Sequence, residues 1–300
     1  MNWIGITFLS AGFFAVISFV DKFVLEKKIK DHRGMTIYAA IVGLVIGSLL
    51  WLVTGRPLLS LIDAMIVIFT GMLTIWSMAL YYMAIMDDDV STVIVFFQVT
   101  PVMVLILSVV FLGETLSHWQ LIGFVLVLAS VISVSLSGNE GIFSFTRSLK
   151  LILIVDFMLA VSAVLIKFTI NNNSFLGILC YESLGIGFGG ACLYFGFSSV
   201  RSSFKKSYLL IGRNVFLILL LNEGFYVFAK GLMFYAFSIG PTALVSAVGS
   251  TQVFFGFFFG AVLTFFLPTI FKEDIRRKEL FRKTIAACVM VFGIWLAHSR

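Results

Sequence analysis

Residues 87–136 read DDDVSTVIVFFQVTPVMVLILSVVFLGETLSHWQLIGFVLVLASVISVSL. Two apolar runs, about Ser91–Phe111 and Gln120–Leu136, flank a short polar segment that contains Leu112–Gly113–Glu114. A helix needs roughly 20 mostly apolar residues to cross the hydrocarbon core of a membrane. This stretch therefore predicts two transmembrane helices joined by a tight connection.

The composition of the whole chain agrees with a membrane protein. Of its 300 residues, 60% are hydrophobic and 12% are charged, and the mean hydropathy is +1.09. Soluble chains are nearer half apolar and a quarter charged. The 34 Phe and 25 Gly fit a polytopic bundle, in which Gly allows helices to approach closely. These values exclude disordered, collagen-like, coiled-coil and disulfide-rich secreted proteins, and we assign the basic charge to membrane orientation rather than to nucleic-acid binding.

Ten apolar runs are separated by polar or turn-forming breaks and predict ten membrane-spanning helices. They are Trp3–Val24, Thr36–Val53, Ala64–Met83, Ser91–Phe111, Gln120–Leu136, Leu149–Phe168, Phe175–Phe197, Val215–Phe237, Thr242–Leu267 and Thr284–Ala297. The basic segment after Leu267 contains Phe271, Ile275 and Leu280 and predicts a short interfacial helix. The first run has no basic region before it and no small-residue cleavage site after it, so we expect a retained helix.

The distribution of Lys and Arg predicts the orientation. Sixteen of them lie in the loops after the first, third, fifth, seventh and ninth runs, whereas two, Arg56 and Arg300, lie on the other side. The positive-inside rule places the sixteen in the cytoplasm and both termini outside. A prokaryotic inner membrane is the simplest expectation.

The two halves of the chain resemble each other. FFAVISFVDKFVLEK from Phe13 aligns with FMLAVSAVLIKFTIN from Phe157, and VSTVIVFFQVTPV from Val90 aligns with PTALVSAVGSTQV from Pro241. The two shifts are similar, and each half has five runs. A repeat with an odd number of spans must be inverted in its second copy, a plan that recurs in secondary transporters. We expect an all-α polytopic protein with ten transmembrane helices as two inverted five-helix repeats, residues 1–145 and 146–300.

The stretch Asp87–Leu136 resembles the drug/metabolite transporter superfamily, EamA type. In that family a helix with a mid-span Pro runs into an LGE turn, and Q-x-x-G opens the next helix. Here these features are Pro101, Leu112–Gly113–Glu114 and Gln120–Gly123. The second half lacks the LGE turn, and the charge bias opposes the orientation usual in relatives. The resemblance implies a carrier of small metabolites, without indicating which.

Ionisable residues inside a membrane are costly and are candidates for function. Glu223 and Lys230 lie seven residues apart, so they share a helix face and could bind a zwitterion such as an amino acid. Glu223 or Glu182 could carry a coupling proton. The alternative for Glu223 and Lys230 is ion pairing with other helices. Weaker candidates for function are Asp21, Asp156, Lys22 and Lys167, and the alternative for the two lysines is anchoring at the headgroups.

Uncharged polar residues complete the candidate site. Pro101 frees a backbone carbonyl in the fourth run, which is tolerated where it lines a cavity or is recaptured by a neighbour. The resemblance places the third, fourth, eighth and ninth spans around a central cavity. The substrate-binding candidates are therefore Gln98, Thr100, Asn222, Glu223, Tyr226, Lys230 and Gln252. Interhelical hydrogen bonding is the alternative for the uncharged ones, and Pro101 and Glu114 are expected to be structural, with Glu114 closing the turn.

These features predict a secondary transporter that moves a small polar metabolite, an amino acid or similar, by alternating access, with protons as one energy source. The sequence has no phosphate-binding GxxxxGK[ST] loop, no HExxH, no Cys/His cluster and no GxSxG elbow. We expect no enzyme activity, no catalytic residue, no cofactor, no metal and no nucleic-acid partner, and a monomer or homodimer in the bilayer. The alternative functions are a flippase for a lipid or lipid-linked group and, less well supported, a lipid-modifying membrane enzyme or a scaffold.

Overall fold

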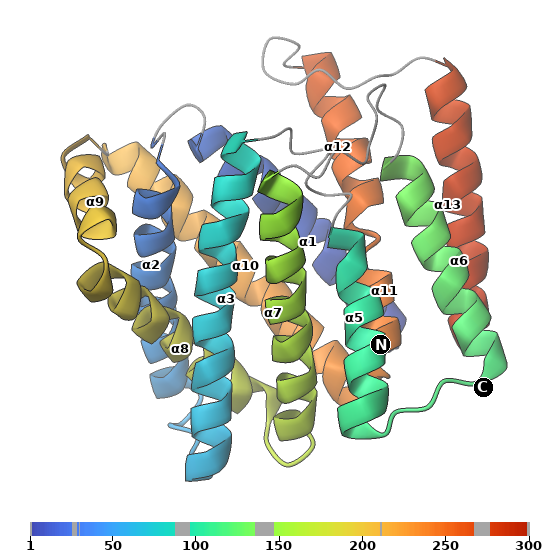
Figure 1. Cartoon of the computed structure of the whole chain (residues 1–300), viewed down its shortest axis with the longest axis horizontal. Coiled ribbons are helices and arrows are strands. Elements are labelled where there is room, and N and C mark those ends of the chain that lie inside the picture. Colours follow the sequence, from blue (N-terminus) through green and yellow to red (C-terminus); the bar gives the residue numbers. More distant parts are fainter. Residues whose placement is uncertain are drawn as a thin grey trace.

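The computed structural model describes residues 2–25, 29, 31–87, 97–135, 147–210, 212–266 and 277–298. Within these ranges the secondary structure is helical and no strand is present. The helices form one bundle (Figure 1). They are α1 (Trp3–Val24), α2 (His32–Val53), α3 (Leu61–Asp87), η2 (Phe97–Val99), α5 (Thr100–Leu107), η3 (Ser108–Leu112), α6 (His118–Ser135), α7 (Arg147–Ile170), α8 (Phe175–Gly196), α9 (Ser198–Leu210), α10 (Arg213–Ile239), α11 (Thr242–Gly249), α12 (Gln252–Phe266) and α13 (Arg277–His298).

The described residues of each of the ten predicted runs include helix, and residues 91–96 of the fourth run lie outside them. Seven described segments are long and apolar enough to cross a membrane, and three shorter apolar helices lie at 100–112, 118–133 and 284–298. The seven long segments confirm the prediction of an all-α, multi-pass integral membrane protein. The fourth run is divided into η2, α5 and η3, and the ninth is divided into α11 and α12.

Two connections differ from the prediction. The segment before Arg213 was expected to be a break, but it contains α9, whose Arg201, Lys205 and Lys206 are exposed. Of the expected interfacial helix after Leu267, Phe271 and Ile275 lie outside the described residues. Leu280 lies in the first turns of α13, continuous with the last apolar run. The sequence predicted a helix around Leu280. It did not predict that this helix continues without a break into the last apolar run.

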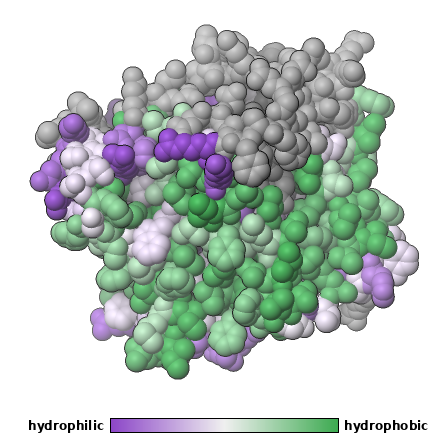
Figure 2. All heavy atoms as spheres, in the orientation of Figure 1, coloured by the Kyte–Doolittle hydropathy of each residue, from purple (hydrophilic) through white to green (hydrophobic). Residues whose placement is uncertain are grey.

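The outer surface is mostly apolar. Figure 2 shows a green hydrophobic band across the middle of the visible face, with hydrophilic residues above and below it. Large side chains such as Phe111, Phe195 and Trp295 are 64–75% exposed. A soluble protein rarely exposes a continuous apolar surface of this kind, whereas lipid tails would cover it.

The two ends of the described chain lie together. The Asn2 side-chain amide lies 3.2 Å from a ring nitrogen of His298. In Figure 1 the C terminus lies at the lower side of the bundle, and α9 and the ends of α1, α3 and α12 lie at the upper side. The exposed basic residues of α9 are therefore on the side opposite the C terminus.

Glycine residues allow the closest helix contacts. A Cβ atom added at Gly185 of α8 would lie 2.3 Å from the Ile68 carbonyl oxygen of α3, so the two backbones meet without side chains between them. Gly123 of α6, the Gly of the Q-x-x-G motif, approaches Gly293 of α13 in the same way. These contacts hold α8 against α3, and α13 against α6.

Candidate functional site

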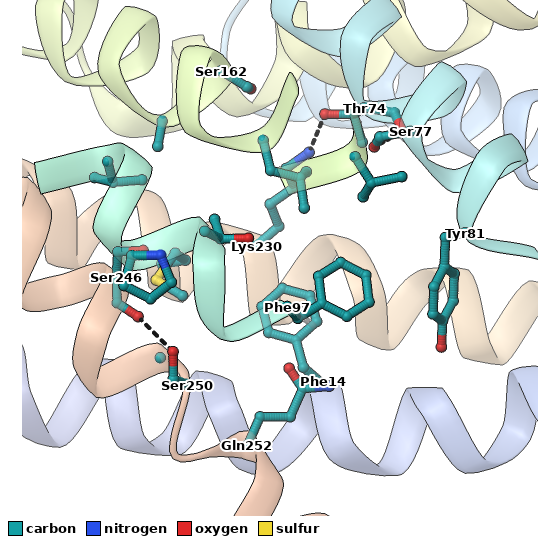
Figure 3. Close-up of a pocket in the computed structure, with 18 of the residues that line it drawn as sticks. Phe14, Thr74, Ser77, Tyr81, Phe97, Ser162, Lys230, Ser246, Ser250 and Gln252 are labelled. Atoms are coloured by element: carbon teal, nitrogen blue, oxygen red, sulfur yellow. Dashed lines mark hydrogen bonds between the residues drawn. The ribbon is translucent and has the colours of Figure 1, made fainter. Parts of the chain in front are cut away.

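A cavity of about 320 Å³ lies within the bundle. Its lining residues come from α1, α3, η2, α5, α7, α10, α11 and α12, and therefore from both halves of the chain (Figure 3). Among the described residues, α2, α6, α8 and α13 contribute none of the lining. The lining contains polar, aromatic and aliphatic side chains. The polar residues of the lining are Ser18, Asp21, Thr74, Ser77, Tyr81, Thr100, Ser162, Tyr226, Lys230, Ser246, Ser250 and Gln252.

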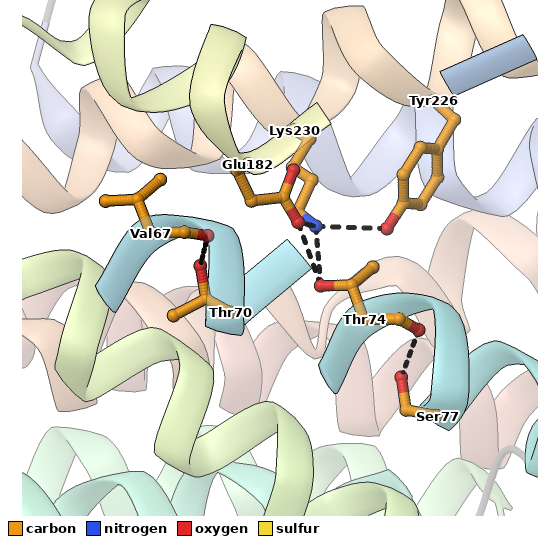
Figure 4. Close-up of polar contacts among 7 residues, drawn as sticks. All are labelled: Val67, Thr70, Thr74, Ser77, Glu182, Tyr226 and Lys230. Carbon is orange, nitrogen blue, oxygen red and sulfur yellow. Dashed lines mark hydrogen bonds and ion pairs between the residues drawn. The ribbon is translucent and has the colours of Figure 1, made fainter. Parts of the chain in front are cut away.

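A buried ion pair forms one wall of this cavity. The Lys230 ammonium donates to the Glu182 carboxylate, to the Thr74 hydroxyl at 3.0 Å and to the Tyr226 hydroxyl at 3.3 Å (Figure 4). The Thr74 hydroxyl donates to the same Glu182 oxygen at 2.9 Å. An ammonium has three donors, and all three of Lys230 are used. This is the ion pair with another helix that the sequence left open as the alternative for Lys230.

Local sequence and close packing together build this ion pair. Tyr226 and Lys230 are four residues apart on α10, so they lie on one helix face. Glu182 comes from α8 and is fully buried. A Cβ atom added at Gly71 of α3 would lie 2.1 Å from the Glu182 carbonyl oxygen. Only a glycine on α3 therefore lets α8 come close enough for Glu182 to meet Thr74 and Lys230.

A second buried carboxylate, Asp21, has a different environment. It lines the cavity from α1 and is 4% exposed. Its carboxylate accepts a hydrogen bond from the Asn222 amide nitrogen, at 2.8 Å. Among the described residues no basic side chain donates to Asp21. The Asn222 amide oxygen is buried and has no hydrogen-bond partner there. Glu223, Tyr81 and Tyr82 interact electrostatically with Asp21, so another acid lies beside it.

A third buried carboxylate lies behind the opposite wall. The Thr100 hydroxyl, on the cavity lining, donates to Asp156 of α7 at 2.5 Å. Asp156 is fully buried, and its second oxygen has no partner among the described residues. Pro101 follows Thr100 at the start of α5, directly after η2, and also lines the cavity. The helix break therefore lies beside the cavity, where freed backbone groups are tolerated.

The structure brings together part of the predicted site. Thr100, Tyr226, Lys230 and Gln252 line the cavity, and the Gln252 amide donates to the Ser18 hydroxyl at 3.1 Å. Asn222 and Glu223 are buried beside Asp21 but are not on the cavity lining. The Gln98 side chain lies outside the described residues, although its backbone is part of η2.

Two of the remaining predicted residues bind helix ends. The Glu114 carboxylate accepts from the backbone nitrogen of Thr242 at 2.9 Å and from its hydroxyl at 2.8 Å. It thus caps the N-terminus of α11 in the second half, besides its place after Gly113, which has a positive φ of 64°. The Lys167 ammonium donates to the carbonyl oxygens of Phe237 and Gly240 at the C-terminal end of α10.

Sequence reasoning missed the small hydroxyl residues of the cavity, Ser18, Thr74, Ser77 and Ser250. Ser and Thr occur throughout the apolar runs and usually bond to their own helix backbone, so their type carries no signal. Asp21 was treated as one of several groups near a span end. A stronger signal was available: Phe14, Ser18 and Asp21 recur at helical spacing, and all three line the cavity.

Comparison with known proteins gives a family match for the first half of the chain and a similar fold for almost all of it. The model of the EamA-like transporter family matches residues 1–136. The match covers slightly less than half of the chain, and residues 1–136 are similar to the EamA-like transporters. This match confirms the resemblance to the drug/metabolite transporter superfamily and supports a membrane transporter of that type. A comparison with curated proteins gives no match.

A solved structure titled "Crystal structure of protein" has a similar fold. Its TM-score is 0.71 at 13% sequence identity, and the alignment covers 99% of this chain and 95% of the other. The similarity at this identity concerns the fold. Because it extends over almost the whole chain, it includes the second half, which lies beyond the family match.

Proposed function

We propose that the protein is a secondary transporter that moves a small polar metabolite, such as an amino acid, by alternating access. The observation that carries this proposal is the cavity between the two halves, which is lined by polar groups from α1, α3, α5, α7, α10, α11 and α12. Its volume of about 320 Å³ is in the range of small-molecule sites. The EamA match over residues 1–136 supports the same class of function.

The proposed architecture has ten spans in two inverted repeats, residues 1–145 and 146–300. Helix packing supports it, because the neighbours occur in matched pairs: α1 packs on α10 as α7 packs on α3, and α1 packs on α11 and α12 as α7 packs on α5. The corresponding helices α2 and α8 pack on each other, as do α6 and α13. Both repeats also have a broken helix beside the cavity, at 97–100 and at 249–252.

The proposed orientation has the basic side in the cytoplasm and both termini outside. The charge bias of the loops supports it, and so does the contact between Asn2 and His298, since ends on one side require an even number of spans.

In this proposal Thr100, Tyr226, Lys230 and Gln252 contact the substrate directly. Asn222 acts through Asp21, to which it donates a hydrogen bond. Gln98 is a further proposed contact, because it lies beside the helix break. Glu223 is a better coupling candidate than Glu182, because Glu182 is already paired with Lys230. A buried carboxylate without a basic partner can take up a proton when the substrate leaves.

Transport by purified protein in liposomes tests the proposal. A panel of amino acids, sugars and nucleotides would be measured with and without a pH gradient, for the wild type and Glu223→Gln. We expect one class of solute to cross, and we expect Glu223→Gln to abolish the component driven by the pH gradient.

Two results would contradict the proposal. Movement of a labelled lipid, with no soluble solute crossing, would replace the carrier with a flippase. A gradient-driven component that survives in Glu223→Gln but disappears in Glu182→Gln would move the coupling role to Glu182.

A further inference from the structure

The charges around the cavity are not balanced. Lys230 is the basic residue of the described lining, and its ammonium is already bound to Glu182. Asp21 lies on the lining with no basic partner among the described residues, and Glu223 and Asp156 are buried close behind the walls. A solute entering the cavity therefore meets uncompensated negative charge from Asp21 and no free positive charge from the described residues.

The hydrogen-bonding group beside Asp21 that lacks a partner in the described part of the chain is also an acceptor. The Asn222 amide nitrogen is used in its bond to Asp21, whereas the Asn222 amide oxygen is buried and has no partner among the described residues. An orphaned buried acceptor beside a carboxylate is costly unless a donor satisfies it. A ligand that donates N–H bonds and carries a positive charge would satisfy the Asp21 carboxylate, which lines the cavity, whereas Asn222 lies behind the lining.

Aromatic rings lie on the same part of the cavity. The ring centroids of Tyr81 and Phe97 are 5.5 Å apart, and those of Phe14 and Tyr226 are 5.8 Å apart. Figure 3 shows Phe14 and Phe97 beside each other and Tyr81 across a gap from Phe97. The faces of such rings attract cations, and the attraction increases where water is excluded.

We propose that this cavity recognises an organic amine with a net positive charge, and that Asp21 binds its ammonium group within the ring surface of Phe14, Tyr81 and Phe97. This inference rests on the proposed carrier function and deepens it, because it assigns the recognised group of the substrate. Lys230 then positions Glu182 and Thr74 instead of binding a substrate carboxylate.

A matched set of four probes tests the inference: 2-phenylethylamine, 2-phenylethanol, phenylacetate and phenylalanine. These compounds share one ring and differ mainly in charge. Binding to the full-length protein in a nonionic detergent would be measured by calorimetry, with sodium chloride as a separate inorganic probe. We expect the amine to bind about 10–100-fold more tightly than the alcohol, the value of one or two charge-assisted hydrogen bonds.

The variant Asp21→Asn should remove this preference, because it should weaken amine binding much more than alcohol binding. Asp21→Glu should keep the preference in part, because it keeps the charge. Asp63→Asn is the matched control, since Asp63 lies at the start of α3, away from the cavity, and should bind the amine as the wild type does.

The inference is overturned if phenylacetate or phenylalanine binds more tightly than the amine, because Lys230 would then be the recognising group. It is also overturned if sodium binds and the amine does not, or if Asp21→Asn keeps the preference. If the amine binds through Asp21 but no solute crosses liposomes, the carrier function fails and the binding site stands. If uncharged solutes cross and the amine neither binds nor crosses, the carrier stands and this inference fails.

Discussion

Glu182 and Asp21 are both carboxylates buried in the same bundle, but they are stabilised differently. Glu182 meets an ammonium and a hydroxyl from two other helices. Asp21 meets one amide nitrogen and lies beside a second acid, Glu223. A compensated buried charge fixes the packing of the helices that supply it, whereas an uncompensated one is left for something outside the chain. The difference supports our proposal that the region of Glu182 holds the bundle together and that the region of Asp21 binds a ligand.

The largest effect is expected when the ion pair is broken. Lys230→Met leaves the Glu182 charge buried without its partner, which should destabilise the protein by about 3–5 kcal/mol. The midpoint of unfolding in detergent would measure this loss. The double variant with Glu182→Gln removes the orphaned charge and should recover most of the stability. A double variant as unstable as Lys230→Met would mean that the pair does not stabilise the packing.

The next largest loss of stability is expected when the close packing of α8 on α3, which brings Glu182 to Lys230, is disturbed. Gly185→Ala places a methyl group against the Ile68 carbonyl and should destabilise by about 2–3 kcal/mol, as overpacking does. The matched control is Gly256→Ala on α12, where nothing lies within 4 Å of an added Cβ atom. It should be neutral or stabilising by up to about 1 kcal/mol. Equal unfolding midpoints for the two variants would contradict the packing argument.

A smaller loss of stability is expected at Glu114, whose carboxylate accepts hydrogen bonds from the first residue of α11. Glu114→Ala removes the acceptor for the Thr242 backbone nitrogen and hydroxyl and should destabilise by about 1–2 kcal/mol, as the loss of a helix cap does. Glu114→Gln keeps one acceptor oxygen and should lose less. Unfolding midpoints in the same detergent would order the two, and the reverse order would argue against capping.

The smallest change in stability is expected at Asp21. Asp21→Asn removes a buried carboxylate that no basic group among the described residues pairs with, and it keeps an oxygen that can accept from Asn222, so the change should be below about 1 kcal/mol. Thermal unfolding without ligand would measure it. A loss as large as that of Lys230→Met would place Asp21 among the groups that stabilise the fold and would weaken its assignment to a ligand.

The sequence by itself determined where the apolar helices lie along the chain and that lipid surrounds them. Ten apolar runs were visible because lipid requires continuous hydrophobic helices, and the first run coincides with α1, Trp3–Val24. Hydropathy is a local property, so it needs no knowledge of neighbours. The residues Thr100, Tyr226, Lys230 and Gln252 could be named because polar groups inside such runs are rare and costly. The LGE and Q-x-x-G motifs indicated the family of the first half.

Only the tertiary structure decided which polar groups meet. Seven residues separate Glu223 from Lys230 on one helix, and this spacing suggested one shared site. The partner of Lys230 is instead Glu182 of α8, and Glu223 lies near Asp21 of α1. Such pairings depend on how closely helices approach, here through Gly71 and Gly185, and on the rotation of each helix about its axis. Neither quantity is contained in the hydropathy of a single run, because each arises from contacts between segments far apart in the chain.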